Sequence, residues 1–352
     1  MRVCLLIGWP IAPNLKQRIA AGEHPRIEVF DLACRLKAEI IDPSVAAQSR
    51  SFLVRVGCFF GIPLGLALLA WQRKGDFDLF YVGNEKIGIL VAALFKFVKR
   101  RPRLVLLNHY LSNPKKAFLF NRLQLQNTVD ALICLSEYQA TFVERELAVS
   151  PRKVFRIHYG GMVDGSFFLP RVKEGEKQKY IFSVGRESRD YDTLFQALRD
   201  SSVRAKIVSS GISGCRNDRH KISDGRLPNV EIVEYVPYPE LRKLYERCSF
   251  VVIPMRNVDY PAGMTAIMEA MAMGKAVIAT YSRGIEEFIE DSITGFWTEP
   301  GNPIALREKV LRLWNNPKLA SEMGKRARES VKSRVDLTRF VEELESILTG
   351  LA

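Results

Sequence analysis

Short apolar runs alternate with helix-like segments along the whole chain. In the first half, apolar runs predict strands at residues 3–7, 27–30, 39–41, 79–82, 104–107, 131–135 and 154–157. In the second half, the pattern restarts and predicts strands at residues 180–184, 205–209, 230–233, 250–254 and 276–279. Continuous apolar strands that alternate with helices are typical of a parallel sheet covered on both faces. The pattern therefore predicts an α/β fold built on doubly wound sheets.

A polar segment without periodicity, LPRVKEGEKQK at residues 169–179, separates the two sets of strands. It has the composition of a linker, which divides the chain into an N-terminal domain at residues 1–168 and a C-terminal domain at residues 180–335. In residues 336–352, apolar positions near helical spacing predict a final amphipathic helix. Ligands of doubly wound sheets bind outside the carboxyl ends of the strands, so we expect the two domains to face each other across a cleft.

The composition is that of a globular protein. A length of 352 residues suits two domains, and a hydrophobic fraction of 47% with 26% charged residues separates the chain from disordered proteins. The six cysteines are scattered without a CxxC pair, so neither a metal site nor a disulfide framework is predicted. Met1 and Arg2 lead directly into an apolar strand without a cleavage site, so we expect no signal peptide and a cytoplasmic location.

The net charge of +13 indicates an anionic partner. The sequence contains no zinc finger, no aromatic RNA-binding strand and no evident helix-turn-helix, so nucleic acid is not predicted as a partner. An anionic membrane and a phosphorylated substrate remain. Together they predict peripheral association with the inner face of the cytoplasmic membrane.

Two stretches bear on this membrane prediction. The apolar stretch at residues 56–71, VGCFFGIPLGLALLAW, contains Pro63 and is shorter than the ~20 residues that span a bilayer. It is either a buried helix of the N-terminal domain or a helix that lies in the membrane surface. The stretch at residues 87–103 ends in a basic cluster, which suits either anionic headgroups or a solvated helix end. This cluster includes Lys99, Arg100 and Arg101.

The segment YPAGMTAIMEAMAMGKAVIAT at residues 260–280 predicts a small-residue loop, a short helix and a buried strand. Gly263 lets the backbone approach a ligand closely, and the helix after it exposes amides around Met264 and Thr265. Such a helix N-terminus suits a diphosphate, and the Glu269 carboxylate can accept hydrogen bonds from a ribose. An ordinary loop–helix–strand unit of an α/β domain fits the same spacing.

The sequence AGMTAIMEAMAMGKAVIAT resembles the donor-site signature of the retaining nucleotide-sugar glycosyltransferases of family four, also called glycosyltransferase group 1. This resemblance implies the GT-B fold, in which two Rossmann-like domains face each other across a cleft. It implies that the N-terminal domain binds the acceptor, and that the last helix crosses back to that domain. It also implies that Glu269 binds the ribose and that backbone amides near Gly263 hold the diphosphate.

Two further segments of the C-terminal domain resemble the same family. Gly185 and Arg186 follow a predicted strand, and Arg189 comes three residues later. Both arginines are candidates for catalysis and for binding the donor diphosphate, although a Lys-Gly pair is usual near the position of Arg189. As ordinary residues of a surface loop, they have no such role. The resemblance implies that backbone groups near Tyr235 and Val236 contact the nucleobase of the donor.

The N-terminal domain supplies the remaining candidates. Gly8 follows the first predicted strand and is a donor-binding candidate. His109 follows the strand predicted at residues 104–107, and the resemblance implies a catalytic position close to the reacting sugar. A histidine at a strand end is otherwise commonly structural. Lys115 and Lys116 either hold an anionic acceptor, such as a lipid-linked diphosphate, or are simply solvated.

The resemblance implies transfer of a sugar from a nucleoside-diphosphate sugar to a hydroxyl of a glycan, lipid-linked or small-molecule acceptor, with retention of configuration. The donor is a co-substrate. No cofactor or metal is expected, because a helix N-terminus and arginines can stabilise the diphosphate. Pro261 is a departure, since many members carry there a glutamate that contacts the sugar. Two other functions stay open: a nucleotide-sugar 2-epimerase of the same fold, and a non-catalytic carbohydrate- or membrane-binding derivative.

Overall fold

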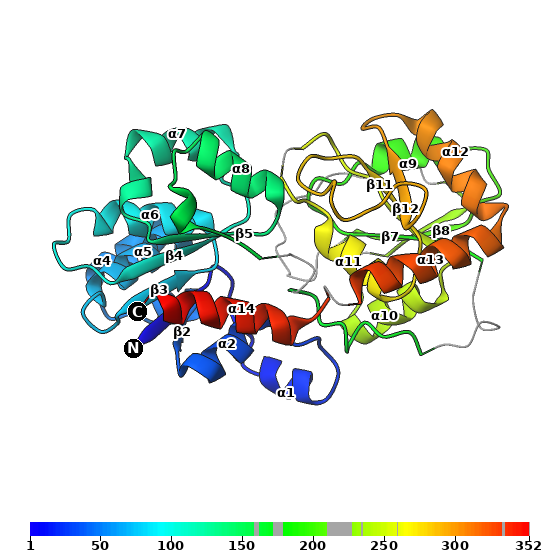
Figure 1. Cartoon of the computed structure of the whole chain (residues 1–352). Helices are drawn as coiled ribbons and strands as arrows, with labels where there is room; N and C mark the ends of the chain where they lie inside the picture. The colour runs from blue at the N-terminus through cyan, green and yellow to red at the C-terminus, as the bar shows by residue number, and fades with distance from the viewer. Residues whose placement is uncertain are drawn as a thin grey trace. The chain divides into compact units, whose positions relative to one another are not determined.

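The computed structural model describes residues 1–157, 162–171, 179–209, 227–233, 235–258, 260–332 and 335–351. The chain divides into two compact units, both drawn in Figure 1. The first unit contains Met1–Lys16, Ile27–Tyr159 and Thr338–Ala352, and the second contains Gln17–Arg26 and Gly160–Leu337. Each unit is built on one parallel sheet with helices, which confirms the predicted α/β fold. Most of the segment predicted as a linker, residues 169–179, lies outside the described residues.

The described residues of the first unit form a six-stranded parallel sheet in the order β2-β1-β3-β4-β5-β6. The strands are β1 (Val3–Leu6), β2 (Glu39–Ile41), β3 (Leu79–Val82), β4 (Arg103–Asn108), β5 (Ala131–Cys134) and β6 (Val154–Arg156). β1, β3 and β5 are buried along their whole length. In Figure 1, α2 (Glu28–Leu36) and α14 (Leu337–Gly350) lie on one side of this sheet, and α5 (Ile62–Gln72) and α6 (Glu85–Phe95) lie on the other. Coverage on both sides explains why these strands are continuous apolar runs.

The last helix belongs to the first unit from Thr338 onwards. Arg35 of α2 forms ion pairs of 3.0 Å with both Glu342 and Glu345 of α14. Leu337, Phe340, Val341, Leu344 and Leu348 are buried. The other helices are α1 (Leu15–Ala20), α3 (Pro43–Ala47), α4 (Phe52–Phe60), α7 (Pro114–Arg122) and α8 (Glu137–Arg145), with short 3-10 turns at Leu125–Asn127 and Pro151–Lys153.

The strand predicted at residues 27–30 is wrong, because this segment begins the helix α2. Val29 and Leu32, three residues apart, are both buried, as the helical period requires. A short apolar run does not distinguish the two structures, and the period becomes visible only over the 9 residues of the helix.

The apolar stretch at residues 56–71 is two helices, because Gly61 ends α4 with a φ of 148° and Pro63 lies in the first turn of α5. α5 is core, as the first of the two interpretations predicts, with Leu66, Ala67 and Ala70 fully buried. α4 packs against α5 at Gly57, where a Cβ atom would lie 3.0 Å from the Cα of Gly65. None of the described helices is both long and apolar enough to cross a membrane.

The described residues of the second unit also form a six-stranded parallel sheet, in the order β12-β11-β10-β7-β8-β9. The strands are β7 (Ile181–Val184), β8 (Ala205–Val208), β9 (Val230–Val233), β10 (Phe250–Ile253), β11 (Val277–Thr280) and β12 (Gly295–Thr298). The helices are α9 (Tyr191–Leu198), α10 (Tyr238–Arg247), α11 (Met264–Ala272), α12 (Pro303–Trp314) and α13 (Pro317–Val331). The edge strand β12 was not predicted, because GFWT is short and begins with a glycine. Gly295 is needed there, since a Cβ atom would lie 2.3 Å from the carbonyl oxygen of Val277.

Both sheets have a point where the strand order reverses. In the first unit, β1 lies between β2 and β3, so the chain turns one way after β1 and the other way after β3. In the second unit, the same reversal occurs between β7 and β10. Ligands of doubly wound sheets bind outside the carboxyl ends of the strands at such a point. The loops after β1, β3, β7 and β10 are therefore where the chemistry of each unit is expected.

Candidate active site

Two glycines lie where the strand order of the second sheet reverses, a place that we call the switch point of the second unit. Gly185 follows β7 with a φ of 109°, and Gly263 precedes α11 with a φ of 83°. Both values favour glycine over residues with a side chain. A Cβ atom on Gly185 would lie 2.3 Å from Nη2 of Arg189, and one on Gly263 would lie 2.5 Å from Sδ of Met255. The second Cβ would also lie 3.4 Å from Nη1 of Arg189, so both loops approach one guanidinium.

The Arg189 guanidinium is buried beneath these glycines. Its Nε donates to the carbonyl oxygen of Val184 at 3.0 Å, and its Nη1 donates to that of Glu187 at 3.0 Å. Burial lowers the pKa of Arg189. Among the described residues, its hydrogen-bond partners are two backbone carbonyls and the sulfur of Met255 rather than a carboxylate. A buried cation held by neutral carbonyls raises the positive potential under the two loops, which favours an anion there. Arg186, directly after Gly185, is half-buried.

The helix α11 begins where Gly185 and Gly263 lie over the Arg189 guanidinium, an arrangement that we call the cradle. Gly263 is its N-cap residue, and because glycine has no side chain, the first amides of the helix receive no side-chain cap from it. Met264 is buried, whereas Thr265 is exposed on the first turn. The positive end of the helix dipole therefore points to the same place as the Arg189 guanidinium. Backbone amides, a helix dipole and a buried cation together form an anion-binding arrangement.

Glu269 lies inside α11 and is buried. Its Oε2 accepts a hydrogen bond from the hydroxyl of Tyr245 on α10 at 2.9 Å. Burial raises the pKa of Glu269 to about 8, and the hydrogen bond from Tyr245 lowers it only in part. The ring of Tyr245 packs edge-on against Phe182 of β7, with the centroids 4.9 Å apart. Sequence reasoning missed Tyr245, and its only signal is the buried apolar spacing of Leu241 and Tyr245 on α10.

The loop before α11 is tied to the loop after β7. The hydroxyl of Tyr260 donates to Oε1 of Glu187 at 3.0 Å and lies 2.6 Å from Oγ of Ser188. The peptide between Tyr260 and Pro261 lies against Gly284, where a Cβ atom would be 2.7 Å from the Pro261 nitrogen. These contacts fix the position of Pro261. Asp259, the nearest carboxylate in sequence, lies outside the described residues.

Tyr235 and Val236 connect β9 to α10, at the same carboxyl edge of the sheet. Tyr235 is exposed and Val236 is half-buried. The structure therefore brings the predicted donor residues of this unit to one edge, around β7, β9 and the start of α11.

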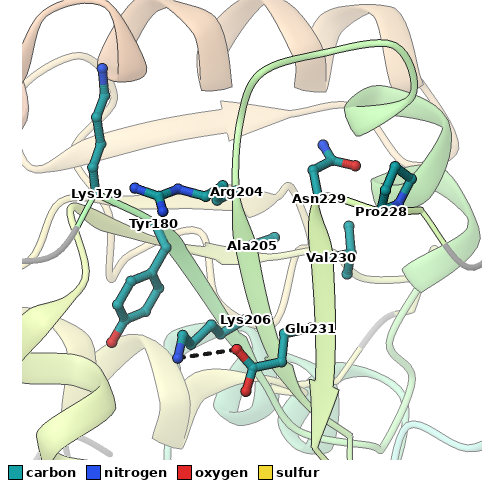
Figure 2. Close-up of a pocket in the computed structure, with 9 residues that line it drawn as sticks. All are labelled: Lys179, Tyr180, Arg204, Ala205, Lys206, Pro228, Asn229, Val230 and Glu231. Carbon is teal, nitrogen blue, oxygen red and sulfur yellow. Dashed lines mark ion pairs between the residues drawn. The ribbon is translucent and has the colours of Figure 1, made fainter.

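An open cavity of about 800 Å³ lies elsewhere in this unit, at the amino ends of β7, β8 and β9 (Figure 2). Lys179, Arg204 and Lys206 line it, and Lys206 forms an ion pair of 3.1 Å with Glu231. None of the predicted site residues lines this cavity. We therefore assign it no part in the donor site.

The switch point of the first unit is built from charged side chains. Glu85 is the first residue of α6, three positions after the end of β3, and it is buried. Its Oε1 accepts a hydrogen bond from Nζ of Lys116 at 2.5 Å. Burial opposes ionisation, but Lys116 and the nearby His109 outweigh it and lower the pKa of Glu85. The other oxygen, Oε2, is buried without a hydrogen-bond partner. Nζ of Lys116 also lies 4.9 Å from the ring centre of Tyr110.

Gly8 and His109 border this cluster. A Cβ atom on Gly8 would lie 3.1 Å from Cδ1 of Ile87 in α6, so the loop after β1 is tightly packed. The backbone oxygen of His109 accepts a hydrogen bond from Nε2 of Gln139 at 2.9 Å. Sequence reasoning missed Glu85. Its signal in the sequence is a carboxylate three residues after a predicted strand.

The remaining cationic candidates differ in their surroundings. Lys99, Arg100 and Lys115 are exposed. Arg101 forms an ion pair of 2.5 Å with Asp130, and Asp130 also accepts from Arg103 at 3.2 Å. Arg101 and Lys116 are thus held by carboxylates in the first unit.

Comparison with known proteins identifies the family. Residues 167–330 match the family model described as "Glycosyl transferases group 1". A capsular polysaccharide biosynthesis glycosyltransferase of Staphylococcus aureus, CapM, is 30% identical over 75% of this chain and 74% of its own length. The chain belongs to the group 1 glycosyltransferases.

Other matches agree with this family. An uncharacterized glycosyltransferase of Methanocaldococcus jannaschii is 28% identical over 63% of this chain, and the match spans 60% of that relative's length. The crystal structure of Anabaena HepE, in complex with UDP and glucose, superposes with a TM-score of 0.74 over 99% of this chain and 100% of HepE, at 14% identity. This group 1 glycosyltransferase therefore has the two-domain α/β fold of the GT-B enzymes.

Proposed function

We propose that this glycosyltransferase transfers a sugar from a nucleoside-diphosphate sugar to a hydroxyl of a glycan or lipid-linked acceptor, with retention of configuration. The observation that carries the proposal is the anion cradle formed by Gly185, Gly263 and the buried Arg189 guanidinium. A diphosphate fits this cradle because amides, a helix dipole and a cation converge on one point.

The donor is held at three places in this proposal. The diphosphate binds at the start of α11, the ribose hydroxyls donate hydrogen bonds to Glu269, and the base lies near Tyr235 and Val236. The crystal structure of HepE contains UDP, which supports a uridine nucleotide as the first candidate. CapM is a glycosyltransferase of capsular polysaccharide biosynthesis, which supports a polysaccharide as the product.

The reaction breaks the bond between the anomeric carbon and the diphosphate oxygen. The acceptor oxygen forms the new glycosidic bond on the same face, and its proton passes to the leaving diphosphate. The leaving group gains negative charge in the transition state. Arg186, Arg189 and the start of α11 stabilise that charge, which is a contribution that needs no metal or cofactor.

The acceptor binds the first unit in this proposal, at the cluster of Glu85, His109 and Lys116. The partly unsatisfied Glu85 carboxylate supports a hydroxyl donor as its partner, because a buried oxygen without a hydrogen bond is costly. We place the reaction at the inner face of the cytoplasmic membrane, where lipid-linked acceptors are found. The net charge of +13 supports an anionic surface as a partner.

Nucleotide binding is the first test. UDP, GDP and ADP are compared by thermal shift, since a ligand that binds only the folded state raises the melting temperature. Calorimetry of Glu269→Ala is expected to show an affinity for the preferred nucleotide at least about tenfold weaker, from the loss of hydrogen bonds to a carboxylate. Glu240→Ala is the control, because Glu240 is an exposed residue of α10 paired with Lys243. Unchanged affinity in Glu269→Ala contradicts the donor site.

Product analysis separates transfer from the other functions. Incubation with donor and acceptor is expected to give a glycoside whose anomeric configuration, measured by NMR, equals that of the donor. An epimerised nucleotide sugar formed from donor alone indicates an epimerase. Nucleotide binding without either product indicates a binding protein. Activity that persists in the presence of a chelator supports a metal-independent reaction.

A further inference from the structure

The outer side of α4 is apolar although it faces solvent. Phe52, Phe59 and Phe60 are exposed by 80%, 86% and 75%. Their spacing places Phe52 and Phe59 two turns apart on one side of the helix, with Phe60 beside them. The opposite side packs on α5, where Val54 and Gly57 are buried. Large aromatic side chains gathered on one exposed helix face indicate an interaction surface.

The charged residues in and just before α4 are all basic. Residues 43–75 contain no aspartate and no glutamate. Arg50, just before α4, and Arg55, in its middle, are both exposed. Neither forms an ion pair with a described residue. By contrast, the nearby Arg73 is held by Glu39 and Asp76.

We propose that the outer face of α4, defined by Phe52, Phe59 and Phe60 with Arg50 and Arg55, binds the surface of an anionic lipid bilayer. α4 has 9 residues, about half of what a spanning helix needs, so it lies in the plane of the membrane. The phenylalanine rings insert between the headgroups, and the arginines contact lipid phosphates.

The charge pattern favours an anionic bilayer over other partners for this face of α4. A second copy of the chain is disfavoured, because a twofold interface would bring the arginines of both copies together without a carboxylate. A bilayer supplies an apolar layer and negative charge along one plane, which matches the composition of this face. The proposal deepens the membrane part of the proposed function, but vesicle binding is measured without donor, acceptor or turnover.

The test uses the full chain with vesicles of phosphatidylcholine alone and with added phosphatidylglycerol, in a co-sedimentation assay. We expect binding to the anionic vesicles, weakening with salt, and little binding to neutral ones. The variant Phe52→Ser/Phe59→Ser/Phe60→Ser is expected to lose at least about a hundredfold in affinity, since each of the three rings contributes about fivefold or more. Arg50→Gln/Arg55→Gln is expected to lose about tenfold or more and most of the salt dependence.

Ile304→Ser is the matched control, because Ile304 is 81% exposed in the second unit and should not affect vesicle binding. All these side chains lie in solvent, so the melting temperature and nucleotide binding should stay unchanged. The proposal is overturned by equal binding to neutral and anionic vesicles, or by a triple variant that binds as well as the wild type. It is also overturned if ultracentrifugation shows a dimer that the triple variant abolishes. Vesicle binding without nucleotide binding rejects the proposed function and leaves this inference standing.

Discussion

The two units share a strand order but differ in what they place at their switch points. Each is a six-stranded parallel sheet in which the order reverses beside the first strand. In the second unit, Gly185 and Gly263 present backbone over a buried guanidinium. In the first, Glu85, Lys116 and His109 present side chains. The same sheet topology thus carries a cradle made of backbone in the second unit and a cluster of charged side chains in the first.

This difference has a chemical meaning. A diphosphate presents the same oxygens whatever sugar is attached, so amides and a helix dipole suffice to bind it. Side chains can read the shape and hydrogen bonding of a particular partner, which backbone cannot do as selectively. In the proposed function, the second unit therefore binds the diphosphate common to all donors, and the first unit recognises the particular acceptor.

The largest expected effect is on the backbone cradle. Gly185→Ala places a Cβ atom only 2.3 Å from Nη2 of Arg189, at a φ of 109° that alanine disfavours. We expect nucleotide affinity about a hundredfold weaker, measured by calorimetry, because the guanidinium must move. Gly301→Ala is the control, since Gly301 has a φ of 66° with nothing within 4 Å. Gly301→Ala should lower the melting temperature through backbone strain but leave nucleotide affinity unchanged. Equal losses of nucleotide affinity in both variants refute a role for Arg189.

Arg189→Met isolates the charge from the backbone. The substitution removes two hydrogen bonds to carbonyls but also relieves the burial of a cation, so these effects on stability oppose each other. We expect nucleotide affinity about thirtyfold weaker, equivalent to about 2 kcal/mol, with a smaller change in melting temperature than in Gly185→Ala. Full nucleotide affinity in this variant would show that the amides act alone.

Glu85→Gln tests the first unit. It removes the ionic partner of Lys116 and the carboxylate that we propose for the acceptor site. We expect kcat/KM for the acceptor to fall about tenfold, equivalent to about 1.4 kcal/mol, while nucleotide affinity stays unchanged. Glu137→Gln is the control, because Glu137 forms an exposed pair with Arg156, a kind of pair that contributes little. A loss of nucleotide affinity in Glu85→Gln contradicts the proposal that the second unit binds the donor and the first unit binds the acceptor.

The smallest effect concerns pH. Burial raises the pKa of Glu269 to about 8, so the carboxyl is protonated in the empty site at lower pH. If ribose binding needs the carboxylate, binding releases a proton, and affinity should fall about fivefold between about pH 8 and about pH 7. Glu269→Gln should remove this dependence in calorimetry. The folded pKa is above that of an unfolded glutamate, so the stability that protonation provides should be fully present below about pH 4.5 and lost as the pH rises to about 8, in the wild type alone.

Part of the donor site could be predicted because its residues are close in sequence. Gly263, Met264, Thr265 and Glu269 belong to one loop and one helix, and local chemistry describes them. Tyr245 could not be predicted, since it reaches Glu269 across 24 positions of the chain. Lys116 was a candidate from the sequence, but its pairing with Glu85, which is 31 positions away, was not predictable. Only packing of separate helices brings these pairs together.

The sequence by itself determined the two α/β sheets, because strands buried on both faces must be continuous apolar runs. It also determined the family signature around Glu269, because that signature is contiguous. Tertiary structure alone decided that residues 27–30 are helical, that Arg189 lies beneath two glycines, and that Phe52 and Phe59 face solvent. α4 is apolar nearly all round, so no period marks its exposed side. Which side of α4 is exposed depends on where α5 packs against it. The hydrophobic pattern of the sequence does not determine that contact.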